Sequence, residues 1–498
     1  MTPEASLARL EAVVDRSGVA NALEVLLPSG GRPRQLPVRT LLLGMLLAAA
    51  DGRPAHLTRV HRALVSLPGP VQRRLSVIVT WRTSPHLLSY RQVERTFALV
   101  SRALAKSEPD GVPSDELCAA VDALLEASVP FEVTKLSTAL AVDWSDLPTF
   151  ARPPPANGER CADPEASWGR RASDAPGPAH ELFFGYEISA ATMVSEESGL
   201  PVPEIVRRIL VTTCAVDPPA AFVAVLDRLA ASGARLGDVL ADSGYAHRVA
   251  EHWAVPLRRI GAELVTDLHP HDRGPRGTFA GATVSNGNLY CPAAPRALLE
   301  LGPLARGASR DEVAAHDRRT AELAHYKLGR ISAIDADGYH RVMCPAAAGK
   351  LRCPLRPESL TLSHSRPTVL RPPEHAPVCC SQQTVTVPPE VTAKTAQKHD
   401  YPSRVHRLSY ARRTAVERSF SRTKDRASTD MTQGWCRVMG VTAISLFAAA
   451  AFVVRNINVL DAFALREAED ERRRSARLPL RRRRRRTTLE DLAEASAH

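Results

Sequence analysis

The pattern of hydrophobic and polar positions separates a helical first quarter of the chain from a strand-rich middle. Residues 1–130 contain amphipathic, leucine-rich segments such as 38–52 and 116–129, in which apolar residues recur at helical spacing. Strand signals are few there. The pattern predicts an all-helical N-terminal domain over residues 1–130.

Within this first domain, residues 89–107 combine exposed cations with an apolar face. Such a helix could bind DNA, and we expect this domain to recognise DNA ends. An ordinary amphipathic scaffold helix would show the same pattern, and no helix-turn-helix signature distinguishes the two.

After residue 130 the pattern changes to short apolar runs rich in β-branched and aromatic residues, which are typical of strands. A helix with proline at its start and glycine at its end lies among them, at 218–233. The predicted order is βββαβαβ, from strands or helices in 135–147, 181–194, 206–216, 218–233, 238–241, 242–255 and 261–270.

Residues 270–400 lose this regularity and become rich in Pro, Gly, Arg and Cys. A structureless connection of that length is uncommon inside a compact domain, so we expect an inserted subdomain. A mixed helix at 409–424 and a buried helical pair at 434–463 follow. The predicted domains are 1–130, 131–269 with 401–465 as the two parts of one core, the insertion 270–400, and a disordered Arg-rich tail, 466–498.

Charge and apolar runs narrow the class of protein. The N-terminus lacks the basic and apolar regions of a signal peptide, and the longest apolar run, 441–454, is too short for a membrane span. We therefore expect a cytoplasmic, nucleoid-associated protein with no membrane partner. Ten arginines in 471–486 account for all but one unit of the formal charge of +11, so nucleic-acid binding through the tail and a merely solvated tail are both open.

Two aspartates end apolar strands in the predicted core. Asp143 follows ALAV and Asp242 follows VLA, although aspartate is depleted in strands. One such aspartate is usually a cap or turn residue. The pair, together with a carboxylate on the late helix, favours a functional site.

The late helix, SYARRTAVERSFSRTK at 409–424, carries four polar residues on one face. At about 100° per residue, Tyr410, Arg413, Glu417 and Lys424 fall within an arc of about 60°. Three carboxylates, Asp143 and Asp242 with Glu417, would supply the hard oxygen ligands that Mg²⁺ prefers. Two such ions about 4 Å apart support in-line phosphoryl displacement.

These motifs resemble the DDE transposases of bacterial insertion sequences, in the subgroup with the YREK signature. The resemblance rests on AVDWSD, LADSGYAHR and the spacing of Tyr410, Arg413, Glu417 and Lys424, with further similar phrases in CADPEASWGRR, ELFFGYE and RNI. It covers roughly residues 35–465. It implies an α/β fold: a ribonuclease H-like catalytic core, a mixed sheet with flanking helices, interrupted by the inserted subdomain and preceded by the helical domain.

The resemblance also implies roles for these residues. Asp143, Asp242 and Glu417 would bind Mg²⁺ or Mn²⁺ for DNA strand cleavage and strand transfer, while Tyr410, Arg413 and Lys424 would hold DNA phosphates. The expected partners are double-stranded DNA, as terminal inverted repeats and target, and a second copy of the chain on DNA. The alternatives are a ribonuclease H-like nuclease without strand transfer and a catalytically inactive DNA-binding protein.

Relatives that form a hairpin intermediate stack an aromatic residue, usually tryptophan, on a flipped base. This chain has no tryptophan between residues 254 and 434. The residues that could substitute are Phe279, Tyr290, Tyr326 and Tyr339.

The insertion carries five cysteines. Four of them could bind a structural Zn²⁺ in a subdomain poor in core residues. Their spacing lacks a compact CxxC pair, so free buried cysteines explain the pattern equally well. The candidates are Cys291, Cys344, Cys353, Cys379 and Cys380.

Overall fold

The computed structural model divides the chain into two compact units. Unit 1 comprises Met1–Ala234 and Thr414–Pro479, and unit 2 comprises Arg235–Arg413 and Leu480–His498. The structure describes residues 3–28, 34–52, 54–81, 84–107, 110–154, 161–172, 180–305, 307–335, 338–425, 429, 431–432 and 434–480.

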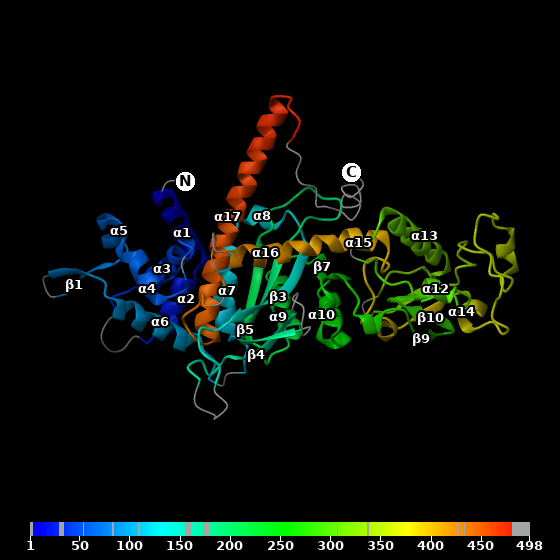
Figure 1. Ribbon diagram of the computed structural model, residues 1–498, viewed down its shortest axis with the longest axis horizontal. Coiled ribbons are helices and arrows are strands. Elements are labelled where there is room, and N and C mark those ends of the chain that lie inside the picture. The colour runs from blue at the N-terminus through cyan, green and yellow to red at the C-terminus, as the bar shows by residue number, and fades with distance from the viewer. Residues whose placement is uncertain are drawn as a thin grey trace. The chain divides into compact units, whose positions relative to one another are not determined.

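Unit 1 begins with helices, as the sequence predicts (Figure 1). The apolar α3 lies at their centre and packs against α1, α2, α4 and α6. Its nearly continuous burial explains the leucine-rich run at 38–50. The helices are α1 (Pro3–Ser17), α2 (Val19–Leu26), α3 (Val38–Ala50), α4 (Leu57–Val65), α5 (Gly69–Arg74), α6 (Tyr90–Leu104), α7 (Asp115–Ala127) and α8 (Phe131–Thr134).

The prediction of an all-helical N-terminal region is wrong at one place. Strands β1 (Ile78–Trp81) and β2 (Ser84–Leu87) pair as an antiparallel hairpin. The run VIVTW is β-branched and aromatic, which favours a strand over a helix.

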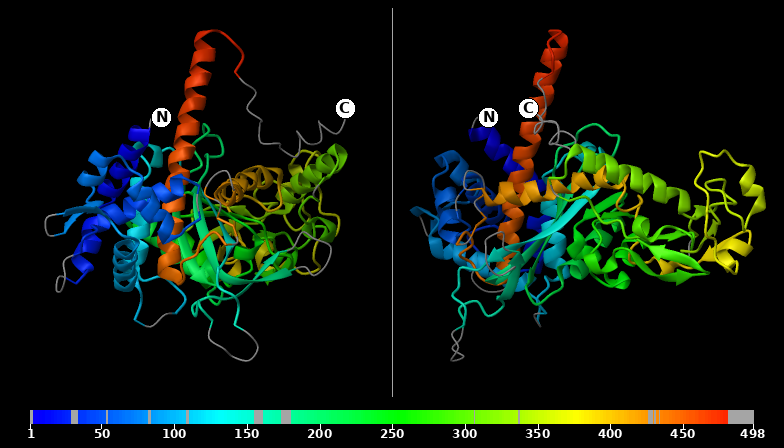
Figure 2. Two further views of the ribbon diagram at one scale, coloured as in Figure 1. Left: turned by 60° about the vertical axis from the view of Figure 1, so that its left-hand side comes forward. Right: turned by 45° about the vertical axis from the view of Figure 1, so that its right-hand side comes forward.

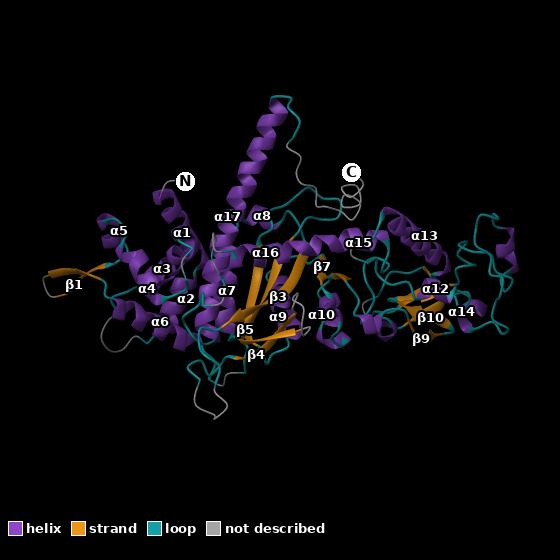
Figure 3. Ribbon diagram, in the orientation of Figure 1, coloured by secondary structure: helices purple, strands orange, loops and turns teal. Residues whose placement is uncertain are grey.

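The strands of unit 1 are organised around the long β5 (Figure 3). One edge of β5 pairs with β3, and the other pairs first with β4 and then with β6, all antiparallel. The bounds are β3 (Leu140–Pro148), β4 (Ser167–Ala172), β5 (His180–Met193), β6 (Val206–Thr213) and α9 (Pro218–Ala231).

Burial explains which strands of unit 1 the sequence predicts. Every residue of β6 is buried, and the predicted strands over β3, β5 and β6 are confirmed. Strand β4 lies between the predicted strands at 135–147 and 181–194, where the sequence predicts no strand. Its arginines and central glycine give no apolar run, so only pairing with β5 marks it as a strand.

The C-terminal part of unit 1 consists of α16 (Thr414–Lys424) and the 35-residue α17 (Val441–Ser475). The predicted helical pair is one helix, and the predicted disorder from residue 466 is wrong up to Ser475. Among the described residues, α17 alone is long and apolar enough to cross a membrane. However, 94% of its most apolar 18-residue segment is buried. It therefore has the burial of a core helix, and its charged end extends from the unit (Figure 2).

The RNI phrase attaches α17 to the rest of unit 1. The Asn456 amide accepts a hydrogen bond from the Val206 N–H at 2.8 Å and donates to the Val206 carbonyl at 2.8 Å. The adjacent Arg455, which is fully buried, donates to Ser419 Oγ of α16 at 2.7 Å. Burial lowers the pKa of Arg455 to about 9. RNI therefore has a structural role. Asn456 provides hydrogen-bond partners for the backbone at the start of β6, and Arg455 holds α16 on the core.

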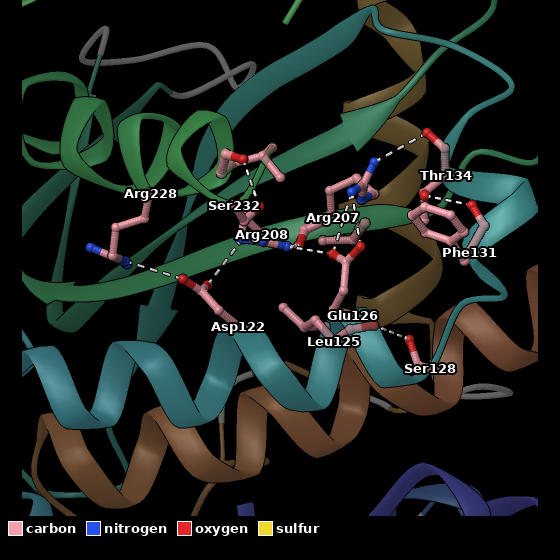
Figure 4. Close-up of polar contacts among 12 residues, drawn as sticks. Asp122, Leu125, Glu126, Ser128, Phe131, Thr134, Arg207, Arg208, Arg228 and Ser232 are labelled. Atoms are coloured by element: carbon pink, nitrogen blue, oxygen red, sulfur yellow. Dashed lines mark hydrogen bonds and ion pairs between the residues drawn. The ribbon is translucent and has the colours of Figure 1, made fainter. Parts of the chain in front are cut away.

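A network of ion pairs joins the N-terminal helices to the strands of unit 1 (Figure 4). Arg208 of β6 bonds Glu126 of α7 at 2.8 Å and lies 3.5 Å from Asp122 of α7. Arg207 bonds Glu126 at 3.0 Å, and Arg228 of α9 bonds Asp122 at 3.2 Å. Arg207 and Arg208 are both buried, so the carboxylates of α7 compensate positive charges that would otherwise be buried without a partner.

Unit 2 contains a parallel strand pair, β7 with β8, followed by small antiparallel sheets. Its strands are β7 (Asp238–Ala241), β8 (Glu263–Thr266), β9 (Pro275–Phe279), β10 (Ala282–Ser285), β11 (Asn288–Tyr290), β12 (Gly329–Arg330), β13 (His340–Met343) and β14 (Val385–Val387). Its helices are α10 (Ser243–Ala246), η1 (Ala250–His252), α11 (Ala254–Arg259), η2 (Pro270–Asp272), α12 (Arg296–Leu299), α13 (Arg310–Tyr326), η3 (Pro357–Thr361), α14 (Val378–Ser381), η4 (Pro389–Val391), α15 (Arg404–Tyr410) and η5 (Ala411–Arg413).

The predicted element order over 135–270 is confirmed, apart from the added β4 and the division of 242–255 into short helices. The protein is α/β, with parallel and antiparallel strand pairs and flanking helices. The boundary of unit 2 falls before β7, so Asp242 belongs to the same unit as the insertion.

Candidate functional site

Asp143 lies on the face of β3 that α16 covers. Thr192 of β5 donates to Ser419 Oγ of α16 at 3.0 Å, so that face of β5 is turned toward the helix. Thr192 pairs across the sheet with Ala141, whose side chain shares its face. Side chains alternate along a strand, so Asp143 and Ser145 point the same way as Ala141. Asp143 is partly exposed there.

Lys424 binds β3 from the end of α16. Its Nζ donates to Ser145 Oγ at 2.8 Å, to the Asp146 carbonyl at 2.9 Å and to Asp146 Oδ1 at 2.9 Å. Burial acts to raise the pKa of Asp146, but Lys424 and Arg171 outweigh it and lower that pKa. Lys424, the predicted phosphate-binding lysine, is thus already paired with a carboxylate. It fixes the end of α16 to β3 at a point two residues beyond Asp143.

Glu417 is exposed in the first turn of α16. It precedes Lys424 by seven residues, which places both on one stripe of the helix. Unit 1 therefore brings one strand aspartate and one helix glutamate to the same two packed elements, α16 and β3.

In unit 2, Asp242 follows β7 directly, as predicted. Its Oδ1 accepts the N–H of Gly244 at 2.9 Å, and the side chain stays partly exposed. Asp267 follows the parallel neighbour β8 in the same way. Carboxyl ends of adjacent parallel strands meet at one edge, so unit 2 carries two carboxylates at that edge.

The signature helix is not one continuous α-helix. Residues 411–413 form the 3₁₀ turn η5 between α15 and α16, so the angular spacing expected from an unbroken helix is wrong. Tyr410 ends α15, and the Arg413 guanidinium lies 5.5 Å from its ring centre. Burial raises the pKa of Tyr410, and Asp267 and Asp242 raise it further. Tyr410 and Arg413 therefore lie at the acidic edge of β7 and β8.

His406 positions Tyr410 from one turn earlier on α15. The ring centres of His406 and Tyr410 are 5.8 Å apart with an interplanar angle of 11°, and Tyr401 contacts His406 edge-on with 5.0 Å between ring centres. His406 Nε2 lies 3.0 Å from the carbonyl of Thr266, the last residue of β8. The Tyr401 hydroxyl donates to Asp267 Oδ1 at 2.7 Å. This chain of contacts fixes the tyrosine relative to the strand end.

The burial of His406 predicts a loss of stability in acid. Desolvation lowers its pKa to about 4, so from pH 6.5 downward the unfolded chain binds a proton that the folded chain does not. Asp267 opposes this shift, while His399 and Arg407 add to it. Between pH 7 and pH 5 the folded state should lose about 2 kcal/mol through this group.

Urea unfolding at both pH values measures the effect. The His406→Phe variant keeps a stacking ring but cannot titrate, so it should show less of the acid loss than the wild type. An identical pH slope in the two proteins would contradict the account.

A buried ion pair holds η5 on the start of β7. Arg412 donates to Asp238 Oδ2 at 2.6 Å, and Lys398 donates to Asp238 Oδ1 at 2.6 Å. Arg412 and Asp238 are 5% and 3% exposed. Arg412 is not part of the YREK pattern, yet it fixes the turn that carries Arg413.

The chemistry of the predicted ligands fits Mg²⁺, because Asp143 and Asp242 are partly exposed carboxylates and Glu417 is an exposed one. As the side chains stand, the described residues contain no group of three or more His, Cys, Asp or Glu that could hold a metal ion. The ligand role of the three carboxylates therefore remains a proposal.

Burial separates the aromatic residues considered for base stacking. Tyr290 and Tyr326 are 2% and 7% exposed and pack in the core of the insertion, so they offer no accessible face. Phe279 lines a cavity of about 390 Å³. Tyr339 is 41% exposed.

Sequence reasoning missed three residues of the site: Asp146, Asp267 and His406. AVDWSD contains Asp146, but its pairing with Lys424 depends on tertiary packing. Asp267 follows an apolar strand just as Asp143 and Asp242 do, so the same signal could have found it. His406 had one available signal, its position four residues before Tyr410.

The remaining family-like phrases have structural roles. Asp163 in CADPEASWGRR is fully buried and accepts hydrogen bonds from Thr149 Oγ1 and from the Tyr186 hydroxyl, both at 2.7 Å. Glu165 accepts the N–H of Val441 at 2.7 Å, at the start of α17. These contacts hold the segment before β4 on unit 1. Comparison with protein-family models, curated proteins and solved structures finds no match for this chain.

Proposed function

We propose that this chain is a DDE transposase that cleaves DNA at transposon ends and transfers the strands to a target. The observation that carries the proposal is the packing of α16 on β3. It brings the Asp143 strand and the Glu417 helix together, with the signature Lys424 bonded beside Asp143. The resemblance of AVDWSD, LADSGYAHR and the YREK spacing supports the same conclusion. The fold proposed for the core is ribonuclease H-like.

In this proposal Asp143, Asp242 and Glu417 hold Mg²⁺ or Mn²⁺. When bound, two such ions activate the attacking oxygen and stabilise the leaving one during in-line displacement at phosphorus. The protein's own contribution is to hold the carboxylates on rigid elements: a paired strand, a strand end and a helix packed on the sheet.

Arg413 and Tyr410 supply the phosphate contacts of the proposal. The guanidinium can bind a phosphate bidentately, and the raised pKa of Tyr410 keeps its hydroxyl protonated as a donor. Lys424 acts first as a brace between α16 and β3. Its charge is shared with Asp146, so its contact with DNA would be weaker than that of Arg413.

The proposed partners are the terminal inverted repeats, the target DNA and a second copy of the chain when two ends are paired. The proposed location is the cytoplasm, on the nucleoid. The N-terminal helical region is the candidate for end recognition.

A joining assay tests the proposal. Labelled DNA with an exposed 3′ end from beside the gene is mixed with protein, a divalent cation and a plasmid target. A transposase yields covalent joints with the plasmid. A nuclease cuts the DNA but yields no joints, and an inactive binding protein shifts the DNA without either product.

The tail should add affinity without specificity. Residues 481–486 are six arginines that lie outside the described residues, whereas Arg472 and Arg473 pair with Glu469 on α17. Removing 481–498 should weaken binding to all DNA sequences alike. The slope of log K against log salt should fall by up to about 5 if all six contact phosphates.

Replacing the six arginines by lysines gives the matched control, because the charge is kept. A deletion that weakened only cognate binding would show that the tail reads sequence.

A further inference from the structure

The insertion brings its five cysteines together from separate segments of unit 2. Cys291 follows β11, Cys344 follows β13, and Cys379 and Cys380 lie on α14. All five are buried, at 4% exposure or less. Three, including Cys353, belong to one core cluster and the other two to a second, and Leu355 packs against both clusters.

Four of these thiols lie within electrostatic range of one another. Each of Cys291, Cys344, Cys379 and Cys380 interacts with the other three. Cys353 interacts with Cys291 and Cys344.

The spacing of the adjacent pair Cys379 and Cys380 is compatible with a tetrahedral metal. Sγ of Cys379 and Sγ of Cys380 are 3.9 Å apart. Zn–S bonds of about 2.3 Å place neighbouring sulfurs of a tetrahedron about 3.8 Å apart.

We propose that Cys291, Cys344, Cys379 and Cys380 bind one structural Zn²⁺, with Cys353 outside the ligand set. Four thiolates bind the ion and four protons leave, with no change of oxidation state. As the side chains stand, the described residues contain no group of three or more His, Cys, Asp or Glu that could hold a metal ion. Binding therefore requires the four thiols to move closer together than the structure shows.

The surroundings explain what the ion would do. Between β13 and β14 the chain forms only η3 and α14, with few apolar side chains to hold it. A zinc ion that links β11, β13 and α14 would contribute its binding energy to the folding of this segment. Zinc binds thiolates and therefore displaces the thiol protons, so the binding should weaken in acid.

Metal content tests the proposal on the full-length chain, purified under reducing conditions. Elemental analysis should find about one zinc per chain in the wild type. Cys344→Ser and Cys380→Ser should lose most of it. The matched controls Cys353→Ser, inside the cluster, and Cys161→Ser, in unit 1, should keep it.

Cobalt supplies a second measurement that does not depend on the folding of a serine variant. Wild-type chain loaded with Co²⁺ should show the intense visible bands of tetrahedral thiolate coordination, and Cys344→His should shift those bands while retaining the metal. Well under one zinc per chain together with no such cobalt spectrum would overturn the proposal. Loss of zinc in Cys353→Ser with retention in Cys380→Ser would overturn the assigned ligands.

Discussion

The Asp242→Asn variant should lose DNA end cleavage by about 10³-fold or more while still binding the DNA. Asparagine keeps the size of the side chain, and its carbonyl can still accept the Gly244 N–H that caps α10. The substitution removes the negative charge that would hold a divalent cation. Without the metal the transition state would lose several kcal/mol of stabilisation, which corresponds to a rate about 10³-fold lower. Cleavage of labelled DNA, with binding measured in parallel, checks the result.

Asp311→Asn is the matched control for this variant. Asp311 is an exposed aspartate in the first turn of α13, in the same unit as Asp242. It should cleave at the wild-type rate. Cleavage by Asp242→Asn at a rate close to that of Asp311→Asn would remove Asp242 from the metal site.

The Arg208→Ala variant should destabilise unit 1 by about 2–3 kcal/mol. Arg208 is 4% exposed, and its removal leaves Asp122 and Glu126 with less compensating charge at a buried contact between α7 and β6. Asp122 would keep Arg228, and Glu126 would keep Arg207. The loss is measured as the free energy of unfolding from urea titration.

Two further variants separate charge from packing at this contact. Arg228 has a side chain that is 32% exposed, so Arg228→Ala should cost about 1 kcal/mol or less. The double variant Arg208→Met with Asp122→Leu should recover part of the stability, because it removes a buried charge pair instead of one partner. A loss below about 1 kcal/mol in Arg208→Ala would show that the network is not important for stability.

Much of the fold can be predicted from the sequence because local patterns carry it. The apolar runs of β3, β5 and β6 and the proline-to-glycine limits of α9 are local signals, and each of these predicted elements is present. Strand β4 and the division of the signature helix at η5 are not predictable in this way. The first depends on pairing with β5, and the second on the Arg412–Asp238 ion pair, whose partners are 174 residues apart.

The candidate site shows the same limit. Asp143 and Asp242 can be found because each ends an apolar run. The pairing of Lys424 with Asp146 and the stacking of His406 on Tyr410 arise only when α16 packs on β3 and α15 packs beside β8. The five thiols give the sequence no compact motif, since chain segments of very different length separate them.

The measurement that tests the central claim most directly is mapping of the ends produced when purified protein, Mg²⁺ and the DNA flanking its gene are incubated together. The proposed function predicts cuts at the inverted repeats that leave 3′ hydroxyls able to join a target plasmid, and predicts no cuts with Asp143→Asn. DNA that is bound at the repeats but stays intact with Mg²⁺ and with Mn²⁺ would contradict the account.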